Sequence, residues 1–179
     1  SPESGFTVSS TCVGETAGFS NTTTIQGGGG LSFSWDFGDT GTSILSNPTH
    51  QYAPVAGNYD VTLIATSALN GCTDTTFQNI RIADQPVAQF SWSPLVVCVG
   101  NQVTFSNTST GTGTDTISSH IWDFGDGFGS NDTNPVYAYA DTGYYNVTLT
   151  VVSPTNCDSS LTLQLYVIPS PTASFTANA

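Results

Sequence analysis

Apolar and polar residues alternate over several short stretches of this sequence. The alternation covers 33–37 and 59–65 in the first half of the chain, and 145–151 and 161–167 in the second half. A period of two over about four to eight residues is typical of strands that have one face in a core. No stretch combines helical periodicity with capping residues, so the sequence predicts an all-β fold.

The same pattern occurs twice. The segment Trp35–Asp39 (WDFGD) returns as Trp122–Asp126, which is 122 − 35 = 87 residues later. A period of this size is a domain, because the repeats of solenoids have about 20–50 residues. Each repeat has about seven short strands with turn residues between them, which predicts a β-sandwich. We therefore predict two tandem immunoglobulin-like sandwiches, 1–84 and 85–169, and the start of a third repeat at 170–179.

The chain is acidic, with 13 Asp and Glu residues, one basic residue (Arg81) and a net charge of −12. This charge disfavours nucleic acids and anionic lipids as partners. Only 8% of residues are charged, and the abundant Thr, Ser, Asn and Gly are typical of an extracellular β-protein. No run of 18 apolar residues is present, so the sequence predicts no membrane insertion.

Four cysteines occur in register, Cys12 and Cys72 in the first repeat and Cys98 and Cys157 in the second. They lack the clustered Cys/His spacing of zinc sites, so we predict disulfides formed in an oxidising compartment. Two pairings remain open. Pairing within each repeat has to bridge about 17 Å between opposite ends of a sandwich, whereas a disulfide needs Cα atoms within about 7 Å. The alternative joins Cys12 to Cys157 across the joint and leaves Cys72 and Cys98 for neighbouring repeats.

The pattern CxG…FxN…WDFGDG…NPxxxY…GxYxVTLxV resembles the PKD (polycystic kidney disease) domain, an immunoglobulin-like β-sandwich. The second copy carries the whole motif, whereas the first has Thr40 in place of the last Gly. The version with cysteines resembles the serial repeats in very large surface proteins of gliding or biofilm-forming bacteria, in which PKD repeats are stalks. PKD domains also occur beside catalytic domains in secreted proteases and chitinases, where they assist binding to insoluble substrate.

The aspartates of the repeated motif resemble paired catalytic carboxylates or a metal cup, but we predict a structural role. General acid/base work needs one carboxyl group in an apolar pocket, whereas Asp36 lies outward on its strand and Asp39 opens a turn, where Asp accepts backbone N–H bonds. The inward Trp35 belongs to the core. The predicted structural residues are Trp35, Asp36, Gly38, Asp39, Trp122, Asp123, Gly125 and Asp126, and no catalytic residue is predicted.

Other candidate residues are fewer. We predict no cofactor; calcium is the weaker alternative, with Glu3 and Glu15 as the acidic residues near the N-terminus. Trp92, whose counterpart is Val8, either packs at the domain joint or presents a platform for a sugar ring. His120 falls on a strand position and is predicted to be partly buried.

Three further features remain. No nucleophile is spaced with His50, so it is not predicted to be a base. The hydroxyls of Tyr52 and Tyr139 are expected to bond to backbone. Asn21 and Asn107, in N-x-[ST] sequons, are interpreted as structural, whereas glycosylation of Asn131 and Asn146 stays open.

The predicted function is a non-catalytic, extracellular stalk of a large bacterial cell-surface adhesin of the gliding-motility kind. Its expected partners are neighbouring repeats, and its terminal strands are expected to resist tension in shear in an elongated rod. Side chains along 146–148 are expected to add bonds between sliding strands. The alternative is an accessory module that binds a surface polysaccharide or protein, and an enzyme is not expected.

Overall fold

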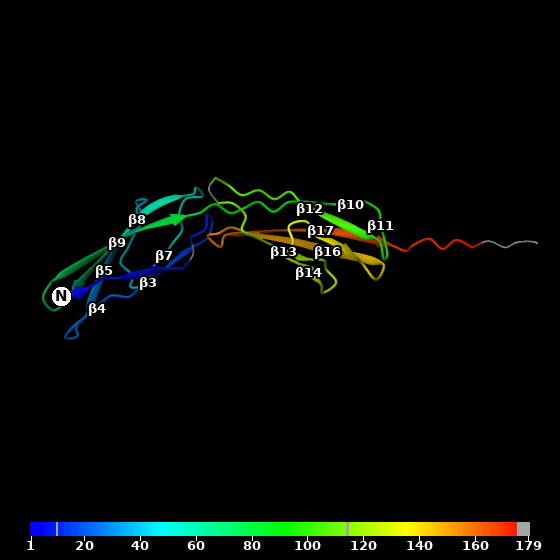
Figure 1. Ribbon diagram of the computed structural model, residues 1–179. Coiled ribbons are helices and arrows are strands. Elements are labelled where there is room, and N and C mark those ends of the chain that lie inside the picture. The colour runs from blue at the N-terminus through cyan, green and yellow to red at the C-terminus, as the bar shows by residue number, and fades with distance from the viewer. Residues whose placement is uncertain (10, 114, 175–179) are drawn as a thin grey trace, which may run out of the picture. The chain divides into compact units, whose positions relative to one another are not determined.

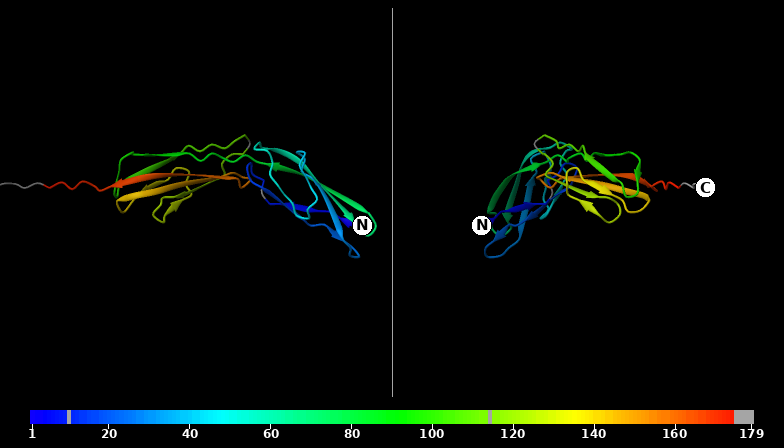
Figure 2. Two further views of the ribbon diagram at one scale, coloured as in Figure 1. Left: turned by 180° about the vertical axis from the view of Figure 1, so that it is seen from behind. Right: turned by 45° about the vertical axis from the view of Figure 1, so that its right-hand side comes forward.

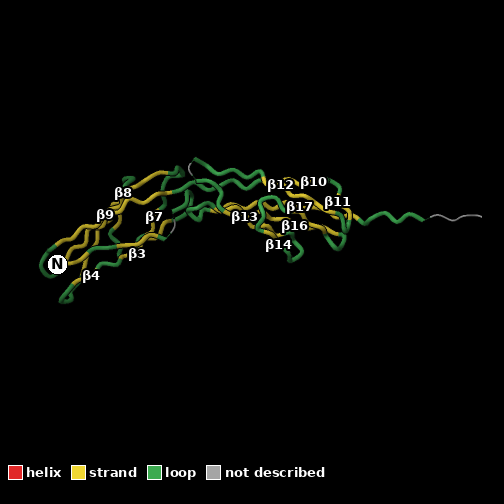
Figure 3. Tube along the Cα trace, in the orientation of Figure 1, coloured by secondary structure: helices red, strands yellow, loops and turns green. Residues whose placement is uncertain are grey.

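The computed structural model describes residues 1–9, 11–113 and 115–174, in two compact units, Ser1–Asp84 and Gln85–Ala179. Among these described residues the regular elements are strands, joined by turns and loops (Figures 1 and 3). The all-β prediction is therefore confirmed. The expected third repeat begins in residues 170–174, which carry no regular element, and its Phe175 lies outside the described residues.

The first unit is a sandwich of two sheets whose inward faces share one core. The ring centroids of Phe6 and Trp35, from opposite sheets, lie 5.2 Å apart. One sheet has the order β2 (Phe6–Val8), β3 (Ala17–Asn21), β7 (Thr49–His50). The other has the order β6 (Thr42–Ser43), β5 (Leu31–Asp36), β8 (Gly57–Ser67), β9 (Thr73–Ile82), and a small ladder joins β1 (Pro2–Glu3) to β4 (Thr24–Ile25).

The second unit repeats this architecture around its own core. The ring centroids of Phe90 and Trp122 lie 5.0 Å apart, close to the 5.2 Å of the equivalent pair in the first unit. One sheet has the order β10 (Phe90–Ser93), β12 (Gln102–Asn107), β15 (Val136–Ala138). The other has the order β11 (Val97–Cys98), β17 (Asp158–Ile168), β16 (Gly143–Val152), β13 (Ser119–Asp123), β14 (Gly129–Ser130).

The predicted alternation is the physical origin of these cores. In the second half of β8 alternate residues are fully buried, as are the matching positions of β16: Val61, Leu63 and Ala65, then Val147, Leu149 and Val151. Because side chains alternate across a strand, the residues between them face outward. Figure 2 shows the long β16–β17 pair, coloured from yellow-orange to red, from two further sides.

In each unit the chain enters at one end of the last strand and leaves at the other. The Ser4 N–H donates to Asp74 Oδ2 (2.6 Å) near the start of β9, and the chain leaves after Ile82. The Ala88 N–H donates to the hydroxyl of Ser159 (3.4 Å) near the start of β17. We call the end where the chain enters a unit its proximal end and the other its distal end; a strand of 10 or 11 residues separates them by about 33–36 Å.

Candidate functional site

The motif aspartates of the first unit order the turn that follows the Trp strand. Gly38 N lies 2.9 Å from Asp36 Oδ1, and Gly41 N lies 3.0 Å from Asp39 Oδ1. Gly38 has a φ of +80°, and a Cβ there would lie 2.8 Å from the backbone oxygen of Asp60. Both carboxylates therefore hold backbone N–H groups, and the glycine admits a close backbone approach.

The second unit has the same turn. Gly125 N lies 2.8 Å from Asp123 Oδ1, and Phe128 N lies 3.2 Å from Asp126 Oδ1. Gly125 has a φ of +82°, and a Cβ there would meet the backbone of Asn146 at 2.7 Å. The two turns are copies of one structural device.

The second carboxylate oxygen of the turn aspartate has a different partner in each unit. His50 Nε2 lies 2.8 Å from Asp39 Oδ2, and its ring stacks on Phe37 at 4.2 Å and 8°. In the second unit the Tyr137 hydroxyl donates to Asp126 Oδ2 (2.7 Å). Both partners lie 11 residues after their aspartate (50 − 39 = 137 − 126 = 11), which an alignment of the repeats would have revealed, although we did not predict the pair.

The local charges lower rather than raise the pKa of the aspartate in the first unit. Partial burial works to raise the pKa of Asp39, but the hydrogen bonds from His50 and Gly41 and the charge of His50 outweigh it, so the pKa lies below the ordinary value of an aspartate. A general acid at neutral pH needs a raised carboxyl pKa. The chemistry of this turn is therefore that of an ordered ionised carboxylate.

The corner tyrosines bond as predicted. The Tyr52 hydroxyl donates to the backbone oxygen of Phe37 (3.2 Å), and the Tyr139 hydroxyl donates to that of Phe124 (3.1 Å). Burial, with the nearby Asp39 and Asp126 carboxylates, raises both phenol pKa values. Trp35 and Trp122 are buried in the two cores, where the sequence predicts them.

One of the two predicted cysteine pairings, the pairing within each repeat, is wrong. Cys12 and Cys157 are disulfide-bonded, whereas Cys72 and Cys98 carry free thiols, so neither pair within a unit forms. The reason is the length of the last strand: Cys72 precedes β9, and Cys12 pairs in parallel with Ala83 at its far end, 83 − 72 = 11 residues away. At about 3.3 Å per residue this is about 36 Å. Cys12 and Cys157 are the residues that the alternative prediction joins.

The remaining candidates for a ligand or metal contact are Trp92, Glu3 and Glu15. Trp92 is half-buried against the core of its unit, and its indole N–H is buried with no hydrogen-bond partner among the described residues. Its role as a ligand contact stays a prediction. Glu3 lies on β1, and Glu15 lies in the turn after Cys12. In residues 1–9, 11–113 and 115–174, no group of three His, Cys, Asp or Glu side chains is placed to hold a metal ion.

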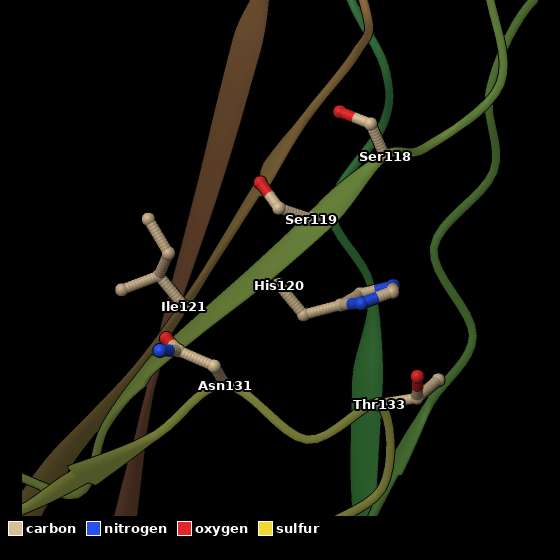
Figure 4. A pocket seen from close by; sticks show the side chains of 6 residues that line it. All are labelled: Ser118, Ser119, His120, Ile121, Asn131 and Thr133. Carbon is tan, nitrogen blue, oxygen red and sulfur yellow. The ribbon is translucent and has the colours of Figure 1, made fainter.

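An open pocket of about 560 Å³ lies in the second unit, beside the first half of β13. Its lining is mixed, with five polar residues and one apolar residue, and carries no carboxylate: Ser118, Ser119, His120, Ile121, Asn131 and Thr133. Figure 4 shows His120 on the opposite side of the strand from Ser119 and Ile121, and His120 is partly buried, as predicted. The loop that supplies Asn131 is anchored by Trp122, whose indole N–H donates to the backbone oxygen of Asp132 (2.9 Å). No motif or repeat in the sequence indicates this pocket.

The first half of this strand has one open edge. Within the described residues, β13 pairs with β16 along Ser119–Asp123, but β14 pairs only with Trp122 and Asp123. The pocket therefore lies where a ladder partner is missing, and its hydroxyl, amide and imidazole groups can donate and accept hydrogen bonds.

Over the described part of the chain, no helix has the length and hydropathy of a membrane-spanning helix.

The model of one protein family, described as PKD domain, matches residues 2–82 and again 83–167. The chain is 39% identical over 90 residues to a pre-pro-metalloprotease PrtV of Vibrio cholerae; the match covers 50% of this chain and 10% of that protein. The chain thus spans about a tenth of the length of the curated relatives it matches.

Two solved structures extend the comparison. The PKD1 domain of the V. cholerae metalloprotease PrtV is 32% identical, with 47% of this chain and 98% of that chain covered and a TM-score of 0.42. Fibronectin(III)-like modules of Clostridium thermocellum CbhA are 13% identical, with 97% and 100% covered and a TM-score of 0.55. The second likeness shows the fold alone.

Proposed function

This chain belongs to the PKD domain family, as two tandem copies, and on that premise we propose that it is a non-catalytic spacer in a large bacterial cell-surface protein. It gives length and mechanical stiffness to a stalk that presents other modules, as in adhesins of gliding bacteria. The proposal places the chain outside the cell. Its acidic, Thr- and Gly-rich composition and the disulfide-bonded Cys12 and Cys157 support that placement, because disulfides persist in oxidising compartments.

The observation that carries the proposal is the parallel pairing of terminal segments in each unit. In the second unit, β11 pairs in parallel with β17 through Val97↔Val167 and Cys98↔Ile168. Tension pulls the N-terminal segment toward the proximal end and the last strand toward the distal end, so the two slide past one another. Bonds loaded in shear fail together, although each contributes only about 1 kcal/mol net.

The first unit has the same arrangement in a shorter form. Cys12 bridges in parallel to Ala83, with hydrogen bonds from Val13 N to Ala83 O (2.8 Å) and from Ala83 N to Thr11 O (2.7 Å). Both units therefore present their terminal contacts to tension in the same geometry. A strand pair of this kind resists pulling better than a hairpin that is opened one bond at a time.

The outer face of the β16–β17 pair carries side-chain bonds across the strands, including bonds of Asn146 and Thr148; new bonds between sliding strands stay a prediction. The Gln164 amide donates to Asn146 Oδ1 (3.4 Å), and the Thr148 and Thr162 hydroxyls lie 2.8 Å apart. The rings of Tyr144 and Tyr166 stack at 4.4 Å. Such cross-strand pairs contribute roughly 0.2–1 kcal/mol each.

Force spectroscopy of the 179-residue chain tests this proposal, with the disulfide of Cys12 and Cys157 reduced so that the tension passes through both units. We expect two unfolding events at forces above those that open a hairpin, and a lower force for the second unit in Val99→Pro. That variant removes the N–H that donates to Ile168 O (2.9 Å) beside the parallel pair. Leu95→Ala, at an exposed position, is the matched control and should change neither force. Low unfolding forces in the native chain would overturn the proposal, as would a compact side-by-side pair in small-angle scattering.

A second candidate function is binding of a neutral polysaccharide. It is favoured by the pocket beside β13, whose lining carries hydrogen-bonding side chains and no carboxylate. The pocket residues of Figure 4 offer groups that pair with sugar hydroxyls. Sedimentation with insoluble polysaccharides tests it, with His120→Ala and Trp92→Ala as variants and Leu95→Ala as control. Binding that either variant abolishes favours this candidate; absence of binding to all polymers tested counts against it.

A further inference from the structure

The four cysteines fall into two structural classes. Cys12 and Cys98, the early class, lie beside the distal end of the last strand, because Cys12 bridges to Ala83 and Cys98 pairs with Ile168. The residue after each makes the same bond: Val13 N donates to Ala83 O (2.8 Å), and Val99 N donates to Ile168 O (2.9 Å). The early cysteines are thus equivalent in conformation as well as in sequence.

Cys72 and Cys157, the late class, lie in the hairpin just before the last strand, at the proximal end. The backbone oxygen of Cys72 accepts from Ser67 N at 2.8 Å, and that of Cys157 accepts from Ser153 N at 2.8 Å. The preceding residues, Gly71 and Asn156, both have positive φ, +68° and +62°. Each unit therefore carries one early cysteine at its distal end and one late cysteine at its proximal end.

The two cysteines of each class differ in redox state. One member of each class, Cys12 and Cys157, is disulfide-bonded, and the other, Cys98 and Cys72, is a free thiol. Cys72 is exposed and Cys98 is half-buried, so neither residue is enclosed in a core. The free thiols stand at positions where the equivalent residue already takes part in a disulfide.

We propose that Cys98 and Cys72 are cross-linking positions: Cys98, at the distal end of the second unit, bonds to Cys72, at the proximal end of the first unit of a second copy of this chain. The free thiols are one early and one late cysteine, as the bonded ones are, so a second copy supplies the complementary class. Such a contact joins two different surfaces of the two molecules, so it either repeats along an open chain or, where both bonds form between the same two copies, closes as a symmetric dimer.

The bond forms by thiol–disulfide exchange with a small-molecule disulfide such as oxidised glutathione. The thiolate of Cys98 attacks glutathione disulfide, a mixed disulfide forms and one glutathione thiol leaves. The Cys72 thiolate then attacks the Cys98 sulfur of the mixed disulfide and releases the second glutathione. Two protein thiols are oxidised to one disulfide, and one glutathione disulfide is reduced to two thiols.

Mixing two single variants of the whole chain tests the pairing. Cys72→Ser retains the Cys98 thiol, Cys98→Ser retains the Cys72 thiol, and isotope labelling of one partner makes the three possible dimers distinct by mass. In a glutathione redox buffer we expect the Cys98–Cys72 heterodimer to exceed each homodimer at least about tenfold, a factor equivalent to about 1.4 kcal/mol. The native chain should give disulfide-linked dimers or longer oligomers that reductant removes.

The outcomes are distinct. Homodimers and heterodimers in statistical proportion, or monomers capped by glutathione, would overturn the inference. Cys72→Ser/Cys98→Ser, the matched control, should form no cross-link while it keeps the thermal unfolding of the native chain. The inference rests on the proposed stalk only for its biological role, and force spectroscopy of this double variant reports on the stalk independently of cross-linking.

Discussion

Thr40 occupies in the first unit the place that Gly127 occupies in the second, with nearly the same backbone conformation. Thr40 has a φ of +80° and Gly127 a φ of +92°. The departure from the sequence motif therefore leaves the turn unchanged. The left-handed conformation costs a β-branched residue roughly 1–2 kcal/mol, and glycine avoids this cost.

Thr40→Gly should therefore stabilise the first unit, by roughly 1 kcal/mol after the extra backbone entropy of glycine in the unfolded chain is subtracted. Chemical denaturation of the native and variant chains measures the difference. The reciprocal change, Gly127→Thr, should destabilise the second unit by a similar amount, since no atom lies within 4 Å of a Cβ placed there. A destabilised Thr40→Gly variant would show that the Thr40 side chain makes a contact that outweighs the strain.

The contact of His50 with Asp39 predicts acid sensitivity of the first unit. Because the pKa of Asp39 is lowered in the folded state, its contribution to stability is present above the unfolded pKa of about 3.9 and is lost as pH falls through the folded pKa. We expect the free energy of unfolding of this unit to decline below about pH 4. NMR of the Trp35 indole N–H during thermal unfolding reports on this unit.

Asp39→Asn is the matched variant for this prediction. It keeps an oxygen for Gly41 N but removes the titrating charge, so the decline that Asp39 contributes should disappear. An unchanged acid profile in Asp39→Asn would show that other carboxylates, such as Asp74 with its lowered pKa, account for it.

Tyr137 predicts the opposite window for the second unit. Burial and the hydrogen bond to Asp126 raise the pKa of Tyr137 to about 12. A raised folded pKa contributes stability that is fully present below the unfolded value of about 10 and is lost as pH rises toward 12. Unfolding of the second unit followed from about pH 9 to 12 should show this loss. Tyr137→His, which copies the first unit, should remove that part of the alkaline decline.

Removal of the buried Tyr139 hydroxyl should destabilise the second unit. In Tyr139→Phe the backbone oxygen of Phe124 loses its donor at 3.1 Å in a fully buried site. An unsatisfied buried acceptor costs about 1–3 kcal/mol. Tyr144→Phe, at an exposed ring, should change the free energy of unfolding by less than about 0.5 kcal/mol in the same denaturation experiment. Equal effects of the two variants would contradict the prediction.

The local features of this protein can be predicted from its amino-acid sequence. Alternation placed Val61 and Leu63 in a core, the repeat gave two sandwiches, and the tyrosine corner followed from Tyr52 and Tyr139 as aromatic residues with a polar hydroxyl. These features depend on residues close in the chain and on the fixed period of a strand, so they can be read without knowledge of which strands meet.

Contacts between residues far apart in the sequence depend on how the strands pair in the folded protein. Cys12 lies beside Ala83 because an N-terminal segment pairs in parallel with the last strand. This pairing separates Cys12 from Cys72 by about 36 Å, whereas the sequence predicted about 17 Å. The partner of Asp39 likewise depends on how β7 brings His50 to the turn. The physical reason is that a strand's pattern fixes which face is buried, whereas pairing across the sheet fixes its neighbours.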